Sequence, residues 1–105
     1  MQRRKAIQGF NFDKYPFFER DIDPKQRAWI EVNGEAIEKN VRQLRSKLSK
    51  SCQFMAVVKA DGYGHDAKLV SDYAIKGGAS QLGVATLKEG IKLRSFGVKK
   101  PILIL

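Results

Sequence analysis

The 105-residue sequence contains a single cysteine and a single histidine, and these scarcities exclude several kinds of protein. A lone cysteine, Cys52, cannot form an intrachain disulfide, which excludes the disulfide frameworks typical of small secreted domains. A lone histidine, His65, cannot build a metal site, and no Cys/His/Asp spacing typical of zinc accompanies it. We therefore expect no metal, a buried structural thiol at Cys52, and a hydrogen-bonded loop residue at His65 that shapes a turn.

Long apolar runs are also absent. No stretch approaches the roughly 18 residues that a transmembrane helix requires. The N-terminus carries basic residues but lacks the apolar core of a secretory signal. Together with the single cysteine, these absences predict a cytoplasmic protein with no membrane partner.

Acidic residues are few relative to basic ones. Eleven Asp and Glu against twenty Lys and Arg give a net charge of +9, which is typical of proteins that bind nucleic acid or an anionic surface. The basic residues are nevertheless spread along the chain, and no basic-aromatic motif accompanies them. We therefore do not expect nucleic acid as a partner, although a basic interaction module remains an alternative.

Residues 1–26 differ in pattern from the rest of the chain. Aromatic residues lie among charges there with no helical or strand period, and Pro16 and Pro24 interrupt the segment. Two interpretations stay open: a docking arm that lays its aromatics on a partner subunit, and a poorly ordered tail, which we favour. We treat 1–26 as an N-terminal extension and 27–105 as the domain.

The first part of the domain predicts a strand followed by a helix. Apolar and polar residues alternate over 27–32, as in a half-buried strand, and Asn33 is a good N-cap. A helix is expected from Gly34 to about Leu48, with Glu38 and Arg42 paired on its surface and a turn at 49–51. The apolar stripe of this helix comprises Ile37, Val41, Leu44 and Leu48.

The remainder alternates regularly between strands and helices. A buried strand is expected at 54–58, a short strand at 81–85 and a final apolar strand at 102–105. A helix that begins near Ala67 and ends at Gly77-Gly78 joins the first two, and a helix that reaches about Phe96 joins the last two. Thr86 and Glu89 form a capping box at the start of the latter helix. The alternation predicts a parallel α/β sheet, which an open sheet and a barrel satisfy equally.

A lysine ends the apolar strand at 54–58. The sequence there is Ala56-Val57-Val58-Lys59-Ala60-Asp61-Gly62-Tyr63-Gly64-His65. Lysine is rarely buried unless it is paired or has a chemical task. At the carboxyl end of a parallel strand it lies where α/β folds assemble their active sites, so Lys59 is the principal candidate for catalysis.

This stretch resembles the cofactor-lysine motif of the alanine racemase family, which is close to Ala-Val-Val-Lys-Ala-Asp/Asn-Ala/Gly-Tyr-Gly-His-Gly. The resemblance implies that Lys59 holds pyridoxal 5′-phosphate (PLP) as a Schiff base and acts as a base on one face of the substrate. It also implies that the Tyr63 hydroxyl binds the cofactor phosphate and that Leu105 touches the cofactor ring. Two positions depart from the motif. Gly62 replaces the commoner alanine, and Asp66 replaces a glycine, which places a carboxylate and a Cβ in a tight turn.

The same resemblance implies a fold and a function. Residues 27–105 would form the opening βα units of a PLP-binding (β/α)8 TIM-type barrel, an incomplete barrel that we expect to fold poorly alone and to present an unpaired edge at 102–105. The implied activity is interconversion of L- and D-alanine for cell-wall precursors by a homodimer. The second catalytic base, a tyrosine from the partner subunit, would lie in later sequence. A racemase for serine or lysine and a non-catalytic PLP-binding domain are the alternatives.

Overall fold

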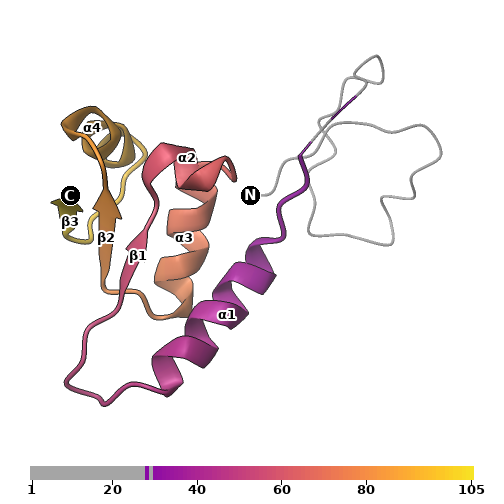
Figure 1. Cartoon of the computed structure of the whole chain (residues 1–105), viewed down its shortest axis with the longest axis vertical. Coiled ribbons are helices and arrows are strands. Elements are labelled where there is room, and N and C mark those ends of the chain that lie inside the picture. Colours follow the sequence, from indigo (N-terminus) through magenta and orange to yellow (C-terminus); the bar gives the residue numbers. More distant parts are fainter. Residues whose placement is uncertain (1–27, 29) are drawn as a thin grey trace. The chain divides into compact units, whose positions relative to one another are not determined.

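The computed structural model describes residue 28 and residues 30–105, and Figure 1 shows their path. The elements follow in the order α1 (Gly34–Ser46), β1 (Met55–Val57), α2 (Lys59–Tyr63), α3 (Ala67–Gly77), β2 (Gln81–Val84), α4 (Leu87–Ser95) and β3 (Ile102–Ile104). The chain divides into one unit up to Gly34 and a second unit from Glu35 onward, and the second contains the sheet. The extension predicted over 1–26 lies outside the described residues.

The three strands form a parallel sheet in the order β1-β2-β3. Val57 pairs with Gly83, and Gly83 pairs in turn with Leu103, so these three residues lie in one row across the sheet. Helix α3 joins β1 to β2, and α4 joins β2 to β3. This confirms the predicted α/β alternation and brings the carboxyl ends of all three strands to one edge.

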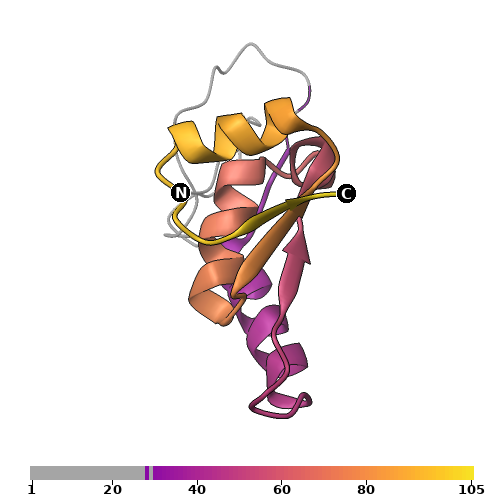
Figure 2. The ribbon, with the colours of Figure 1, turned by 90° about the vertical axis from the view of Figure 1, so that its left-hand side faces the viewer.

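One face of the sheet forms the main hydrophobic core. Residues from β2, from α4 and from the segments that follow β1 and α4 are buried there, and α3 contributes half-buried side chains to the same cluster. Figure 2 shows α3 behind the strands. The buried members are Val58, Leu82, Val84, Leu93 and Val98. On the other face Val57, Leu103 and Leu105 are 38%, 49% and 61% exposed. The prediction of a buried strand at 54–58 is therefore wrong for Val57, because the described helices cover only one side of the sheet.

Helix α1 contacts the C-terminal end of α3 through a second, smaller cluster. Val41 is buried there with Ala74 and Ala79, and Ile37 packs against them. Leu44 is 54% exposed and Leu48 also lies at the surface, so only the first half of the predicted apolar stripe reaches a core. The cluster does not extend to the last turn of α1, which ends at Ser46 rather than at Leu48.

Further sequence predictions have mixed outcomes. The surface pair is confirmed, with Arg42 Nη2 2.8 Å from Glu38 Oε1. The buried thiol is wrong: Cys52 is exposed, because β1 begins only at Met55 and residues 52–54 have no regular structure. The strand predicted over 27–32 is not formed at the described residues of that stretch, where no neighbouring strand pairs with it. Within the described residues, no helix is long and apolar enough to span a bilayer.

The contact of α1 with α3 requires a glycine, which yields a first prediction. A Cβ on Gly77 would lie 2.6 Å from the Glu38 carbonyl oxygen and 2.8 Å from Val41 Cβ. We expect Gly77→Ala to lower the free energy of unfolding by about 1–3 kcal/mol, as overpacking does, measured by urea denaturation. Gly90→Ala is the matched control, since a Cβ there meets only ordinary contacts at 3.8 Å. It should raise stability by about 0.5–1 kcal/mol, because glycine inside a helix costs that much relative to alanine. Equal effects of the two variants would contradict close packing at Gly77.

Candidate functional site

Lys59 lies at the carboxyl end of β1, as the sequence predicts. It follows directly on Val58, whose side chain is buried in the main core, and is itself half-buried. No carboxylate in the described part of the chain lies within ion-pair distance of its amine. A lysine held at this edge by a buried neighbour, with no acid to neutralise it, is suited to binding an electrophile or an anion.

The backbone after Lys59 forms one turn of left-handed helix. Ala60, Asp61 and Gly62 have φ of 52°, 55° and 65°, and Tyr63 has φ of 57°. Left-handed backbone costs L-residues about 1–2 kcal/mol each, so the three non-glycine residues among positions 60–63 need compensating interactions. Space at Gly62 is also tight, because a Cβ there would lie 3.0 Å from Val70 Cγ2 and 3.3 Å from the Ala67 backbone.

Hydrogen bonds within the loop provide part of that compensation. The N–H of Gly62 donates to the Val58 carbonyl at 2.9 Å, and the N–H of Gly64 donates to the Ala60 carbonyl at 3.0 Å. His65 reinforces the turn, since its N–H lies 3.2 Å and its Nδ1 3.1 Å from the Gly62 carbonyl oxygen. This confirms the predicted role of His65 as a residue that shapes the loop.

Glu89 contacts this loop from another element. Its Oε2 accepts a hydrogen bond from the Ala60 N–H at 2.8 Å, and its Oε1 accepts one from the Thr86 hydroxyl at 3.2 Å. Thr86 is the N-cap of α4, as predicted, and accepts from the Glu89 N–H at 3.1 Å. A capping box would direct the glutamate to the Thr86 backbone. Here the carboxylate is shared between Thr86 and the residue next to Lys59.

Two aspartates join the loop to the start of α3. Asp61 Oδ1 accepts from the Ala67 N–H at 2.9 Å, and Asp66 Oδ1 accepts from the Leu69 N–H at 3.2 Å. Asp66 is the N-cap of α3 and has φ of 74°, a conformation that favours glycine. The departure from the racemase motif therefore keeps the glycine-like backbone and adds a helix cap.

The other two predicted site residues lie on exposed surface near the same edge. Tyr63 belongs to the left-handed turn and is 58% exposed. Leu105 follows β3, and its N–H donates to the Val84 carbonyl at 2.7 Å. Lys59 and Tyr63 thus share one loop, whereas Leu105 lies beyond β2 from them. The Leu105 Cδ1 atom lies 3.7 Å from where a Cβ on Gly83 would be, on the open face of the sheet.

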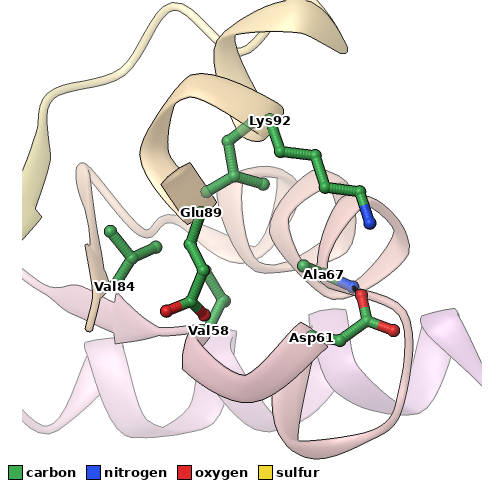
Figure 3. Close-up of a pocket in the computed structure, with 7 residues that line it drawn as sticks. Val58, Asp61, Ala67, Val84, Glu89 and Lys92 are labelled. Carbon is green, nitrogen blue, oxygen red and sulfur yellow. Dashed lines mark hydrogen bonds between the residues drawn. The ribbon is translucent and has the colours of Figure 1, made fainter. Parts of the chain in front are cut away.

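A small pocket lies on the helix-covered side of the loop. Its volume of about 80 Å³ corresponds to two or three water molecules at roughly 30 Å³ each. Figure 3 shows the Glu89 carboxylate beside Val58, and Lys92 extending from α4 over the pocket. Within 28 and 30–105, no three or more His, Cys, Asp or Glu side chains gather as metal ligands. The sequence predicted Glu89 only as a helix cap and did not predict a role for Asp61. The contacts of Glu89 with Ala60 and of Asp61 with Ala67 join separate elements, so no local pattern indicates them.

Comparisons with known proteins bear on this arrangement. Residues 32–105 match the family described as alanine racemase, N-terminal domain. The chain is 55% identical over 84 residues to an alanine racemase from Prochlorococcus marinus, covering 80% of this chain and 22% of that protein. It is 53% identical over 93 residues to an alanine racemase from Nostoc sp., covering 89% and 22%. The chain thus spans about a fifth of the length of these relatives.

Solved structures resemble the fold as well. The crystal structure of alanine racemase from E. faecalis matches with a TM-score of 0.70 and 46% identity, covering 70% of this chain and 20% of that one. The alanine racemase from Bacillus anthracis with bound L-Ala-P matches with a TM-score of 0.69 and 39% identity, covering 70% and 19%.

The cap at Asp66 gives a second prediction. Asp66→Ala should lower the free energy of unfolding by about 1 kcal/mol, because the helix cap is lost while a Cβ stays at the same positive φ. Asp66→Gly should stay within about 0.5 kcal/mol of the parent, since glycine tolerates this φ and serves moderately well as an N-cap. Urea denaturation of both variants measures the difference. If Asp66→Gly were less stable than Asp66→Ala, the strain assigned to the backbone at position 66 would be wrong.

Proposed function

The chain belongs to the alanine racemase N-terminal domain family, and we propose that it provides the cofactor-holding part of a PLP-dependent racemase that interconverts L- and D-alanine. The observation that carries this proposal is Lys59 at the carboxyl end of β1, followed by the ordered left-handed turn. The identity of 55% to an alanine racemase over 80% of this chain supports it. The chain spans about a fifth of such relatives, so the proposal assigns the cofactor lysine to this chain and the activity to a whole racemase.

The described residues fit PLP, the cofactor that this family uses. The Lys59 amine forms no ion pair with a described carboxylate, which leaves it free to bond covalently to the cofactor aldehyde. Beside it, the open face of the sheet carries the apolar side chains of Val57, Leu103 and Leu105. When bound, PLP supplies the electron sink that acidifies the Cα–H of an amino acid.

Three side chains have separate roles in this proposal. Lys59 holds the cofactor and, once released, takes or returns the Cα proton on one face of the amino acid. The Tyr63 hydroxyl, which is exposed at the same edge, donates a hydrogen bond to the cofactor phosphate. Leu105 contacts the cofactor ring from the open face of the sheet. These are the three residues of this chain to which we assign roles from the resemblance to the family.

Inversion requires a second proton donor on the opposite face of Cα. By resemblance this is a tyrosine from the partner subunit of a homodimer, and the remaining barrel strands complete the (β/α)8 fold. In the family, both belong to sequence that these 105 residues do not include. A cytoplasmic location remains a prediction from the single cysteine.

Alanine is the substrate that the comparisons favour. Each relative described above is named an alanine racemase, which supports alanine over serine or lysine. A non-catalytic PLP-binding domain is less well supported, because strained backbone such as the turn from Ala60 to Tyr63 clusters at active sites. Supplying the missing C-terminal portion distinguishes the two: detectable racemisation of alanine that Lys59→Ala abolishes excludes the non-catalytic alternative.

Labelling with PLP tests the proposed role of Lys59 in the chain itself. After incubation with PLP and reduction with borohydride, we expect peptide mass analysis to find most of the phosphopyridoxyl label on Lys59. Lys59→Ala should remove that label, because no other described lysine lies within two residues of the carboxyl end of a strand. Lys88→Ala, which removes an exposed lysine of α4, is the matched control and should leave the pattern unchanged. Label scattered evenly over many lysines would count against a formed cofactor site.

A further inference from the structure

The peptide bond that follows Lys59 is held by a carboxylate from a distant part of the chain. Ala60 N–H donates to Glu89 Oε2 at 2.8 Å, although the two residues are 29 positions apart in sequence. This N–H belongs to the amide that joins Lys59 to Ala60. Fixing its direction fixes the plane of that amide and therefore the ψ angle of Lys59. This ψ limits the side-chain rotamers open to Lys59 and sets the direction in which the loop at 60–63 leaves the strand.

The loop cannot fix this amide by itself. Its internal hydrogen bonds use the N–H groups of Gly62, Gly64 and His65, and Asp61 contributes an acceptor to Ala67. In a turn of helix the first N–H groups have no partner within the turn, and Ala60 is in that position. The Glu89 carboxylate satisfies it with a hydrogen bond to a charged acceptor, which is stronger than one between neutral groups.

Glu89 is itself held in place. Its N–H donates to Thr86 Oγ1 at 3.1 Å, and its Oε1 accepts from the same hydroxyl at 3.2 Å, so backbone and side chain are both tied to the N-cap of α4. Glu89 is half-buried and lines the small pocket behind the loop with Val58 and Asp61 (Figure 3). The carboxylate thus has a defined position before it meets Ala60.

From this geometry we propose that Glu89 is a positioning residue that orients Lys59 toward the cofactor through the Ala60 N–H. The proposal rests on the proposed function, in which Lys59 holds PLP. It adds that the second βα unit, which carries Thr86 and Glu89, sets the direction of the reactive amine on the first. A role in capping α4 alone would require the carboxylate only at the Thr86 backbone.

The test compares Glu89→Ala and Glu89→Gln in the 105-residue chain. Amide hydrogen exchange at Ala60, followed by NMR, should accelerate at least about fivefold in Glu89→Ala, as expected for the loss of one such hydrogen bond. The share of phosphopyridoxyl label on Lys59 after PLP and borohydride should fall severalfold. Glu89→Gln keeps a side-chain oxygen that can accept from Ala60 and should restore most of both signals.

Two controls separate positioning from stability. Thr86→Ala removes the α4 N-cap but leaves the Glu89 carboxylate available to Ala60, so it should lower stability with a smaller effect on Lys59 labelling. Glu38→Ala breaks only the surface pair with Arg42 and should change neither signal. Two results would make Glu89 a helix cap alone. In the first, Lys59 labelling falls in the same proportion to the lost free energy of unfolding in Thr86→Ala and Glu89→Ala. In the second, Glu89→Gln labels Lys59 no better than Glu89→Ala.

The two proposals fail in different ways. If the parent chain shows no preference for Lys59 in labelling, the proposed function fails, while Ala60 exchange still decides whether Glu89 holds the loop. If Lys59 is labelled selectively in the parent and in Glu89→Ala alike, the proposed function stands and the positioning role of Glu89 is overturned.

Discussion

The turn of left-handed backbone at the carboxyl end of β1 is the constraint on which the rest of the site depends. Ala60, Asp61 and Tyr63 adopt a conformation that L-residues avoid, and they adopt it next to Lys59. Such a turn persists only where its surroundings hold it. The surroundings here are α3, capped by Asp66 and joined to the loop through Ala67, and α4, which directs Glu89 to Ala60. Each crossover helix of the sheet thus also supports the loop.

Helices cover only one face of the sheet. That face carries the main hydrophobic core, and the other face leaves apolar side chains exposed. Val58, Leu82 and Val84 are buried against helices, whereas the row of Val57, Gly83 and Leu103 faces outward. A second apolar surface, a groove of about 250 Å³, lies over α4 and β3. In a complete (β/α)8 barrel the open face would become the interior. Exposed apolar surface is therefore expected of a chain that spans about a fifth of its relatives.

Local pattern predicted the elements well and their surroundings less well. Helical spacing, glycine caps and the threonine N-cap located α3 and α4 to within a residue or two, because those signals act between neighbours in sequence. Predictions that needed a distant partner were less reliable. Cys52 is exposed, the outer half of the α1 stripe reaches no core, and the described part of 27–32 forms no strand. An apolar or alternating pattern indicates that a side chain can be buried. Whether another element lies there to bury it depends on the fold.

The sequence by itself determined the parallel α/β order, the family motif and the place of Lys59 at a strand end, because each of these is written in a contiguous run of residues. Only the tertiary structure decided how that lysine is held. The hydrogen bond from Ala60 to Glu89 joins residues 29 positions apart, and Glu89 by sequence was simply the third residue of a helix. A capping carboxylate and a positioning carboxylate have the same sequence signal, and they differ only in which N–H group the folded backbone places within 2.8 Å.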